Sequence, residues 1–239
     1  MRTKLPSIIL NCGEPAGIGL DLCVYLAFKK IPAKITIMAN KKALQVRAQM
    51  HNKKINFIED LEIHKGNGEI HLINAPYKYD VIAGKPIQEN SLVQLKMIDY
   101  AVSNCINKNY DALVTLPISK DILTTTKSIF TGHTEYISNL CKTSNKEVML
   151  LANEELKVAL VTTHVALSRV SSLITKTKLT KVIKTLHFDL KERFKIKNPK
   201  IIITGLNPHA SENGNFGHEE IKVIIPVIES LNNLGFNLI

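Results

Sequence analysis

The chain has 239 residues, of which 45% are hydrophobic and 22% charged; these values are typical of a folded protein with one large or two smaller lobes, not of a disordered chain. Its net charge of +10 raises the question of nucleic-acid binding. However, the basic residues are mostly lysines scattered through helical patterns and only 5% of residues are aromatic, so we expect no nucleic-acid partner. No run approaches the ~20 apolar residues that span a bilayer, so we expect no membrane partner. The four cysteines show no C-x-x-C spacing and no paired framework, which is typical of a reducing compartment and predicts a cytoplasmic protein.

Short apolar runs alternate with amphipathic helical patterns along the chain. Strands are predicted at 7–11, 35–39, 56–59, 70–74, 111–115, 148–152, 158–162 and 200–204. Helices are predicted at 19–30, 41–50, 89–107, 134–142, 177–194 and 219–234. This alternation is typical of an α/β fold, in which mainly parallel sheets carry helices on both faces. Because the apolar patterning lapses near 124–127, we expect a first α/β lobe at 1–126 and a second at 127–239.

The last residues resemble the start of an unfinished strand. Gly235, Phe236 and Asn237 form a helix-stop signal, and the apolar Leu238 and Ile239 follow. An unfinished strand leaves a position in its sheet empty. The sequence therefore predicts that the second lobe is incomplete at its C-terminal end.

A glycine-rich loop joins the first predicted strand to the first helix. The segment 11–21 reads NCGEPAGIGLD, and its free backbone N–H groups are able to hold an anion at the helix start. Its spacing is not the G-x-G-x-x-G dinucleotide fingerprint, which argues against a conventional Rossmann cofactor site. A tight strand-to-helix turn without a ligand is an equally good interpretation.

A second loop, 130–136 (FTGHTEY), leads into a predicted helix. Gly132 and the short polar residues fit a helix start, with Glu135 in its first turn. His133 and the Thr134 hydroxyl would then lie beside free N–H groups, where a phosphate binds well. The alternative is a capping turn whose histidine faces water.

Two histidines follow two apolar strands. His164 comes after the run at 158–162, and His209 lies in the segment 207–212 (NPHASE) after the run at 201–204. Open α/β sheets bind ligands beyond the carboxyl ends of their strands, and imidazole is the commonest protein ligand for a divalent metal. The sequence therefore predicts that His164 and His209 converge on one ion, although a structural role is an open alternative and a zinc site needs a third protein ligand. No comparable context surrounds His51, His64, His71, His187 or His218.

Four short sequence motifs together resemble those of the 4-hydroxythreonine-4-phosphate dehydrogenase family of vitamin B6 biosynthesis. They are 13–19 (GEPAGIG), 132–135 (GHTE), 158–164 (VALVTTH) and 205–210 (GLNPHA) followed by Phe216 and Gly217. They occur in the family's order and extend over most of the chain. The segment 115–120 (TLPISK) departs from the family's usual Thr-Gly-Pro-x-x-Lys, which leaves the role of Lys120 open.

The resemblance implies a two-lobed fold like that of isopropylmalate and isocitrate dehydrogenases, in a homodimer whose active site lies at the interface. It implies oxidation of the substrate's secondary alcohol by NAD or NADP, then loss of CO2 to give 3-amino-2-oxopropyl phosphate. It assigns substrate binding to His133 and Thr134, and ligation of one divalent metal ion (zinc, magnesium or cobalt) to His164 and His209. The family's third metal histidine, in a Tyr-His-Asp-Gln segment, and its main cofactor-binding region have no counterpart in the 239 residues, so we expect this chain by itself to be inactive.

Two other functions stay open on the sequence alone. One is a dehydrogenase of the same fold that acts on another phosphorylated hydroxy acid. The other is a non-catalytic, metabolite-binding α/β protein. Neither a residue that transfers a proton nor a residue that binds the cofactor is assigned.

Overall fold

The structure is a computed structural model that describes residues 5–124, 130, 132–143 and 147–239. By its internal contacts the chain divides into two compact units, Met1–Lys142 and Thr143–Ile239. The lobe boundary that the sequence predicts, between residues 126 and 127, lies outside the described residues.

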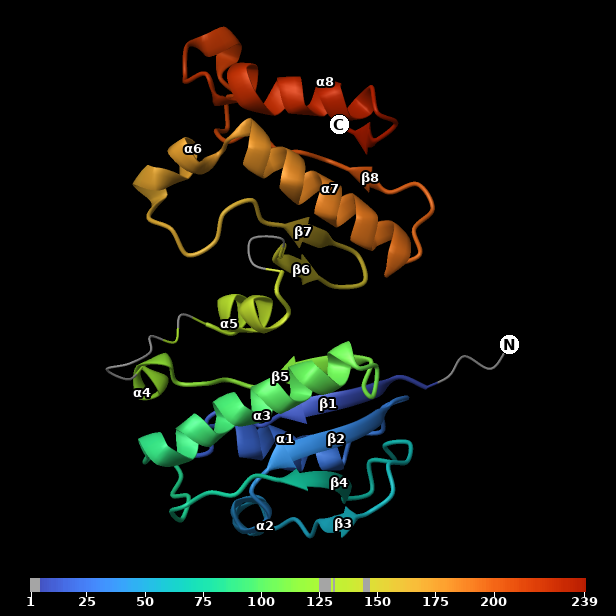
Figure 1. Ribbon diagram of the computed structural model, residues 1–239, viewed down its shortest axis with the longest axis vertical. Coiled ribbons are helices and arrows are strands. Elements are labelled where there is room, and N and C mark those ends of the chain that lie inside the picture. The colour runs from blue at the N-terminus through green and yellow to red at the C-terminus, as the bar shows by residue number, and fades with distance from the viewer. Residues whose placement is uncertain (1–4, 125–129, 131, 144–146) are drawn as a thin grey trace. The chain divides into compact units, whose positions relative to one another are not determined.

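The first unit is built on a five-stranded parallel sheet (Figure 1). Its strand order is β3-β4-β2-β1-β5, and each neighbouring pair runs parallel. This confirms the mainly parallel α/β class. The strands are β1 (Ser7–Asn11), β2 (Lys34–Ala39), β3 (Asn56–Ile58), β4 (Glu69–Asn74) and β5 (Ala112–Thr115).

Helices cover both faces of this sheet. Successive side chains along a strand point to opposite faces, so neighbouring residues of one strand contact different helices. Ile9 of β1 packs in the cluster that contains Ala101 of α3, whereas its neighbour Leu10 packs with Leu20 of α1 and Leu44 of α2. Figure 1 shows α3 on one face and α1 and α2 on the other. The helices of this unit are α1 (Gly19–Ala27), α2 (Lys41–Met50), α3 (Gln88–Ile106), α4 (Lys120–Leu123) and α5 (His133–Leu140).

The strand order places a topological switch point beside β1. The chain passes from β1 through α1 to β2 on one side, and later returns through α3 to β5 on the other. Loops that leave the carboxyl ends of two such strands diverge, and ligands of open α/β sheets bind between them. Here the two loops are the glycine-rich segment after Asn11 and the segment after Thr115 that ends at Lys120.

The second unit has shorter strands. β6 (Leu150–Ala152) and β7 (Lys157–Ala159) pair antiparallel, while β8 (Lys200–Ile201) and β9 (Asn237–Leu238) pair parallel. Its core is formed chiefly by α7 (Lys176–Glu192) and α8 (Ile225–Asn232), and it contains Leu179, Ile183, Val227 and Leu231. The remaining elements are η1 (Leu167–Arg169), α6 (Val170–Leu173), η2 (Glu212–Gly214) and η3 (Glu220–Ile224).

Several predictions for this unit were wrong in detail. The runs at 158–162 and 200–204 were expected to form full buried strands, but β7 ends at Ala159, β8 ends at Ile201, and Ile202 is 69% exposed. Backbone pairing continues only as single bonds, from Leu160 N to Met149 O (3.0 Å) and from Ile203 N to Ile239 O (2.7 Å). An apolar run becomes a buried strand only where other elements cover both of its faces.

The predicted helix at 219–234 is interrupted. It begins with the π-helical turn η3 and becomes α-helical at Ile225. Pro226 has no N–H to donate and its ring crowds the carbonyl four residues earlier, which gives a physical reason for a widened turn at this point. The strand expected at Leu238 is present, because β9 pairs with β8.

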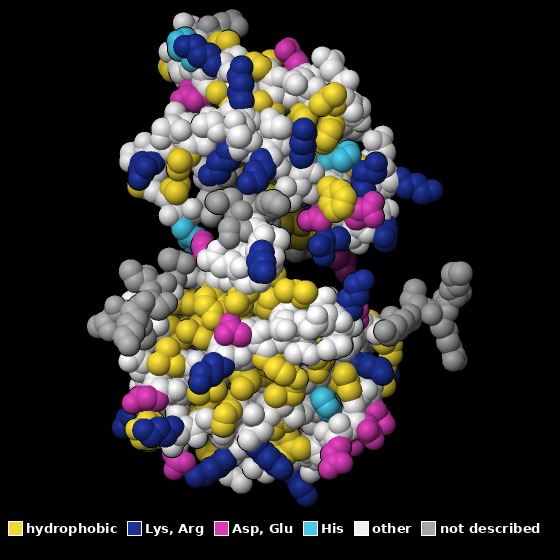
Figure 2. Space-filling view, in the orientation of Figure 1, with side chains coloured by type: hydrophobic (Ala, Val, Ile, Leu, Met, Phe, Trp, Pro, Cys, Tyr) yellow, Lys and Arg dark blue, Asp and Glu magenta, His cyan; other side chains and the backbone are white. Residues whose placement is uncertain are grey.

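In the described part of the chain, no helix combines the length and the apolar character that crossing a bilayer requires. On the face drawn in Figure 2, the Lys and Arg side chains stand dispersed among other residues instead of forming one continuous patch. The expected absence of a nucleic-acid partner remains a prediction.

Candidate active site

The two loops at the switch point of the first unit are bonded to each other. Leu116 N donates to Asn11 O (3.0 Å), and Glu14 N donates to Pro117 O (2.8 Å). Gly13 has a φ of +72°, and a Cβ built on it would lie only 2.1 Å from Pro117 O. Only glycine fits there, because any side chain would both strain the backbone and collide with the neighbouring loop.

The glycine-rich loop carries its own buried carboxylate. Glu14 is 7% exposed, and its Oε1 accepts from Ala16 N (3.1 Å) while its Oε2 accepts from the Ser91 hydroxyl (2.6 Å). A second anion beside this buried negative charge would be repelled. Of the two interpretations that the sequence allows, the structure favours the tight structural turn over the anion cradle.

His133 and Thr134 are the first two residues of α5, as the 130–136 loop suggests. His133 is half-buried and its ring lies edge-on to Phe130, with 5.8 Å between the ring centroids. Its Nε2 is buried and has no hydrogen-bond partner among the described residues. Since buried polar atoms are nearly always paired, an unpaired imidazole nitrogen at the start of a helix suits a ligand that supplies the partner.

Lys120 lies next to this helix start. A Cβ built on Gly132 would be 3.5 Å from Lys120 Nζ and 3.0 Å from Glu135 Oε2, so the missing side chain leaves room for both groups. None of the ion pairs within the described residues involves Lys120. Burial, and secondarily the positive charge of Lys120, lower the pKa of His133. The imidazole is therefore neutral at neutral pH, beside an ammonium group that forms no ion pair within the described residues.

We expect Lys120→Met to raise the pKa of His133. The change removes the positive charge but leaves the burial, so the pKa should rise toward the ordinary value of about 6.5 without passing it. The lowered pKa of His133 also makes the folding stability depend on pH, because protonation of the buried ring opposes folding. The contribution of His133 to stability is complete above the ordinary histidine pKa and is lost as the pH falls through the lower pKa of the folded state. The other charged or titratable groups near this helix start are Glu135 and the Tyr136–Asp99 hydrogen-bonded pair, and the substitution leaves them in place.

Titration of the histidine ring resonances by NMR measures this pKa directly. His187, whose pKa is lowered by burial and then by Lys191, is the internal control and should titrate unchanged. An unchanged His133 titration in Lys120→Met would show that the two groups are electrostatically independent.

His164 and His209 both belong to the second unit, in exposed loops. His164 lies beyond β7 with a φ of +53°. His209 Nδ1 lies 2.9 Å from Glu212 Oε1, and its ring stacks on Phe216 with 5.2 Å between centroids. If Nδ1 carries the proton and donates it to Glu212, Nε2 is left with the lone pair that a metal ligand needs.

The structure leaves the predicted convergence of the two histidines untested. Their strands, β7 and β8, belong to different two-stranded sheets, although Val161 and Ile203 pack against the same core cluster. Imidazole donors suit a divalent metal such as zinc or cobalt. However, no group of three His, Cys, Asp or Glu residues within the described residues is placed to hold a metal ion. The imidazole nitrogens of His164 and His209 are suitable donors for such a metal, but two histidines are fewer than the three protein ligands that a catalytic zinc site has.

Most of the other histidines have structural partners, as their sequence context suggests. They are His51 with Asp21 (2.6 Å), His64 with Leu26 O (2.8 Å), His71 with Thr36 (2.9 Å), and His187 against Phe236 (4.3 Å between centroids).

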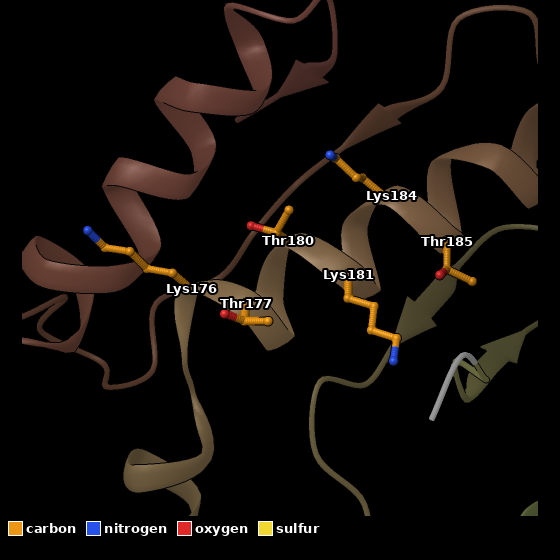
Figure 3. A pocket seen from close by; sticks show the side chains of 6 residues that line it. All are labelled: Lys176, Thr177, Thr180, Lys181, Lys184 and Thr185. Atoms are coloured by element: carbon orange, nitrogen blue, oxygen red, sulfur yellow. The ribbon is translucent and has the colours of Figure 1, made fainter. Parts of the chain in front are cut away.

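A hollow of about 620 Å³ in the second unit lies along α7, and none of the candidate site residues lines it. Its lining consists of alternating lysines and threonines from this one helix: Lys176, Thr177, Thr180, Lys181, Lys184 and Thr185. Figure 3 shows that the three ammonium groups point in different directions. The hollow is a solvated helix face, because its described lining residues all come from α7.

Comparisons with known proteins find the family that the four sequence motifs indicate. A family model described as pyridoxal phosphate biosynthetic protein PdxA matches residues 31–239. The chain belongs to the PdxA family. A 4-hydroxythreonine-4-phosphate dehydrogenase from Neisseria meningitidis serogroup A is 39% identical to it over 98% of this chain and 73% of its own length. The enzyme of the same name from Methylococcus capsulatus is also 39% identical, over 98% of this chain and 71% of its own length.

The fold is similar to that of a solved structure that carries the same enzyme name as these relatives. A crystal structure of 4-hydroxythreonine-4-phosphate dehydrogenase from Klebsiella pneumoniae superposes with a TM-score of 0.88, covering 100% of this chain and 74% of that one, at 23% identity. The prediction of this α/β fold is confirmed, and so is the predicted family. The PdxA-family chain is accordingly an oxidoreductase of pyridoxal phosphate biosynthesis.

Two residues of the PdxA-family chain gain importance only from the structure. The sequence leaves the role of Lys120 open, and its proximity to His133 depends on how α4 and α5 each pack against α3. The sequence gives Glu220 no role, yet it is 4% exposed and accepts a hydrogen bond from Leu206 N, in the loop that carries His209. The only sequence signal for Glu220 is an acidic residue directly before an apolar helix.

Proposed function

We propose that this protein oxidises the secondary alcohol of 4-hydroxythreonine 4-phosphate, with NAD or NADP as hydride acceptor, and that loss of CO2 gives 3-amino-2-oxopropyl phosphate. The observation that carries the proposal is 39% identity, over 98% of the chain, to a dehydrogenase named for this substrate. The geometry of the first unit supports it, because a helix start with free N–H groups and a neighbouring lysine suits a phosphorylated, carboxylated substrate.

His133 and Thr134 would bind and orient the substrate. A neutral imidazole can donate from one nitrogen and accept at the other, and the buried Nε2 of His133 has no competing partner among the described residues. The Thr134 hydroxyl and the Lys120 ammonium would add a hydrogen bond and a positive charge. Glu135 already places a negative charge in the first turn of α5, so Lys120 is needed to keep this end of the helix attractive to an anion.

His164 and His209 would hold one divalent ion, whether zinc, magnesium or cobalt. When bound, such an ion lowers the pKa of the substrate hydroxyl and stabilises the negative charge that decarboxylation creates. Glu212 would keep the ligating nitrogen of His209 in the correct tautomer. The substrate's own oxygen and nitrogen atoms, or a residue from a partner subunit, would complete the coordination.

The protein would act as a homodimer in the cytoplasm. Leu151 and Val158 stand opposite one another on β6 and β7, and they are 59% and 40% exposed. Exposed apolar side chains that adjoin one another are typical of a surface that another chain covers. This supports a second copy of the protein as the partner.

The direct test is an assay of the complete product of the gene. We expect reduced nicotinamide to form from 4-hydroxythreonine 4-phosphate when NAD or NADP and a divalent metal are present, and chelation of the metal to stop it. The unphosphorylated amino acid should be a much poorer substrate, because it leaves the anion site unfilled. Turnover of another phosphorylated hydroxy acid in preference to this one would refute the substrate assignment.

A further inference from the structure

The loop that presents His209 has an unfavourable backbone. Ala210, Ser211 and Glu212 are three consecutive non-glycine residues with positive φ, at +45°, +69° and +37°. The left-handed conformation is unfavourable for a residue that carries a side chain, because its Cβ lies too close to the following carbonyl oxygen. A run of this kind persists only where surrounding contacts hold it, and such strain is concentrated at functional sites.

One buried side chain supplies those contacts. Glu220 Oε1 accepts from the backbone N–H groups of Leu206 (2.8 Å) and Asn207 (3.2 Å), and Oε2 accepts from the Ser211 hydroxyl. The carboxylate therefore ties together residues on both sides of His209. Hydrogen bonds to an ionised carboxylate are stronger than those between neutral groups. The Ser211 hydrogen bond is also the main reason that the pKa of Glu220 lies below its ordinary value.

Asn207 links this clamp to His209. While its backbone N–H is held by Glu220, its side-chain Oδ1 accepts from His209 N (2.7 Å) and its Nδ2 donates to Phe216 O (2.7 Å). Phe216 is the residue on which the His209 ring stacks. Both the backbone and the ring of His209 are thus fixed within two hydrogen bonds of the carboxylate.

Glu220 is itself the first residue of the π-helical turn η3. Single π-turns within α-helices are rare and often occur at functional sites. The loop and the π-turn, two unusual backbone segments, meet at this one carboxylate.

We propose that Glu220 is a positioning residue, which holds the 206–212 loop so that the imidazole of His209 is presented in one orientation. The proposal rests on the proposed role of His209 in the active site. Glu220 itself does not touch the reacting atoms.

The test compares Glu220→Ala and the nearly isosteric Glu220→Gln with Glu219→Ala. Glu219 is the matched control, because its carboxylate also accepts hydrogen bonds, from the Ser171 hydroxyl and His218 N, but none from the 206–212 loop. In Glu220→Ala, we expect hydrogen exchange at Leu206 and Asn207 to accelerate by roughly 10-fold or more, with the α7 and α8 amides unchanged. We expect kcat of the complete protein to fall by about 10–100-fold, with a smaller loss in Glu220→Gln and none in Glu219→Ala.

A double-substitution experiment separates positioning from general stability. If Glu220 acts through His209, Glu220→Gln should cause no further loss of activity in a His209→Asn background. Additive losses, or faster exchange throughout the second unit in Glu220→Gln, would overturn the proposal. Full activity in His209→Asn with a loosened loop in Glu220→Gln would instead contradict the proposed role of His209 while leaving the clamp itself intact.

Discussion

Replacing His209 by alanine is expected to lower kcat/KM of the complete protein by about 100-fold or more. Loss of groups that only support a metal ligand commonly costs 10–100-fold in affinity or activity, so loss of a ligand should cost at least as much. We also expect the affinity for Co²⁺, followed by the absorption of the bound ion, to fall with the activity. The two losses should coincide because one imidazole is responsible for both.

His218→Ala is the control for this substitution. His218 lies in the same stretch of chain and is exposed, but neither its sequence context nor its contacts indicate ligation. Its replacement should leave both Co²⁺ binding and activity unchanged. If His209→Ala retained the Co²⁺ affinity of the unsubstituted protein, the metal assignment would be wrong, and His209 would be left with a structural role against Glu212 and Phe216.

Replacing Gly13 by alanine should destabilise the first unit far more than replacing Gly84. Both glycines have nearly the same φ, +72° and +75°, so both substitutions should cost about 1–2 kcal/mol from the left-handed backbone. At Gly84 the new methyl group would have no atom within 4 Å, whereas at Gly13 it would lie 2.1 Å from Pro117 O. Forcing the two loops apart should add about 1–3 kcal/mol or more.

Urea denaturation of the two variants measures this difference in the free energy of unfolding, since the shared backbone strain cancels between them. We also expect Gly13→Ala to weaken substrate binding, because the displaced loop leads to Lys120. Equal destabilisation by the two substitutions would mean that the two loops at the switch point can move apart with no change in the free energy of unfolding. The loops would then not fix the position of Lys120.

The elements of the first unit could be predicted closely from the sequence. The strand at 7–11 and the helix at 41–50 coincide with β1 and α2, and the other predicted elements of this unit differ by a few residues at their ends, whereas the short helix α4 was not predicted. The apolar run of β1, which is buried from Ile9 to Asn11, and the regular apolar spacing on the helices reflect faces that the fold covers, and these patterns can be read in the order of residues. The second unit was predicted less well, because continuous apolar runs such as 158–162 do not reveal whether both faces of a strand are covered.

By itself, the sequence determined the α/β class, the family and the candidate residues His133, Thr134, His164 and His209, because these depend on residue types in a fixed order. Only the tertiary structure decided that the Glu14 carboxylate is buried against Ser91, that Lys120 lies beside His133, and that Glu220 holds the loop of His209. The contacts between Glu14 and Ser91, Lys120 and His133, and Glu220 and Asn207 join residues that lie 13 or more positions apart, on separate loops and helices. Such contacts are set by how the elements pack, and local periodicity carries no signal of them.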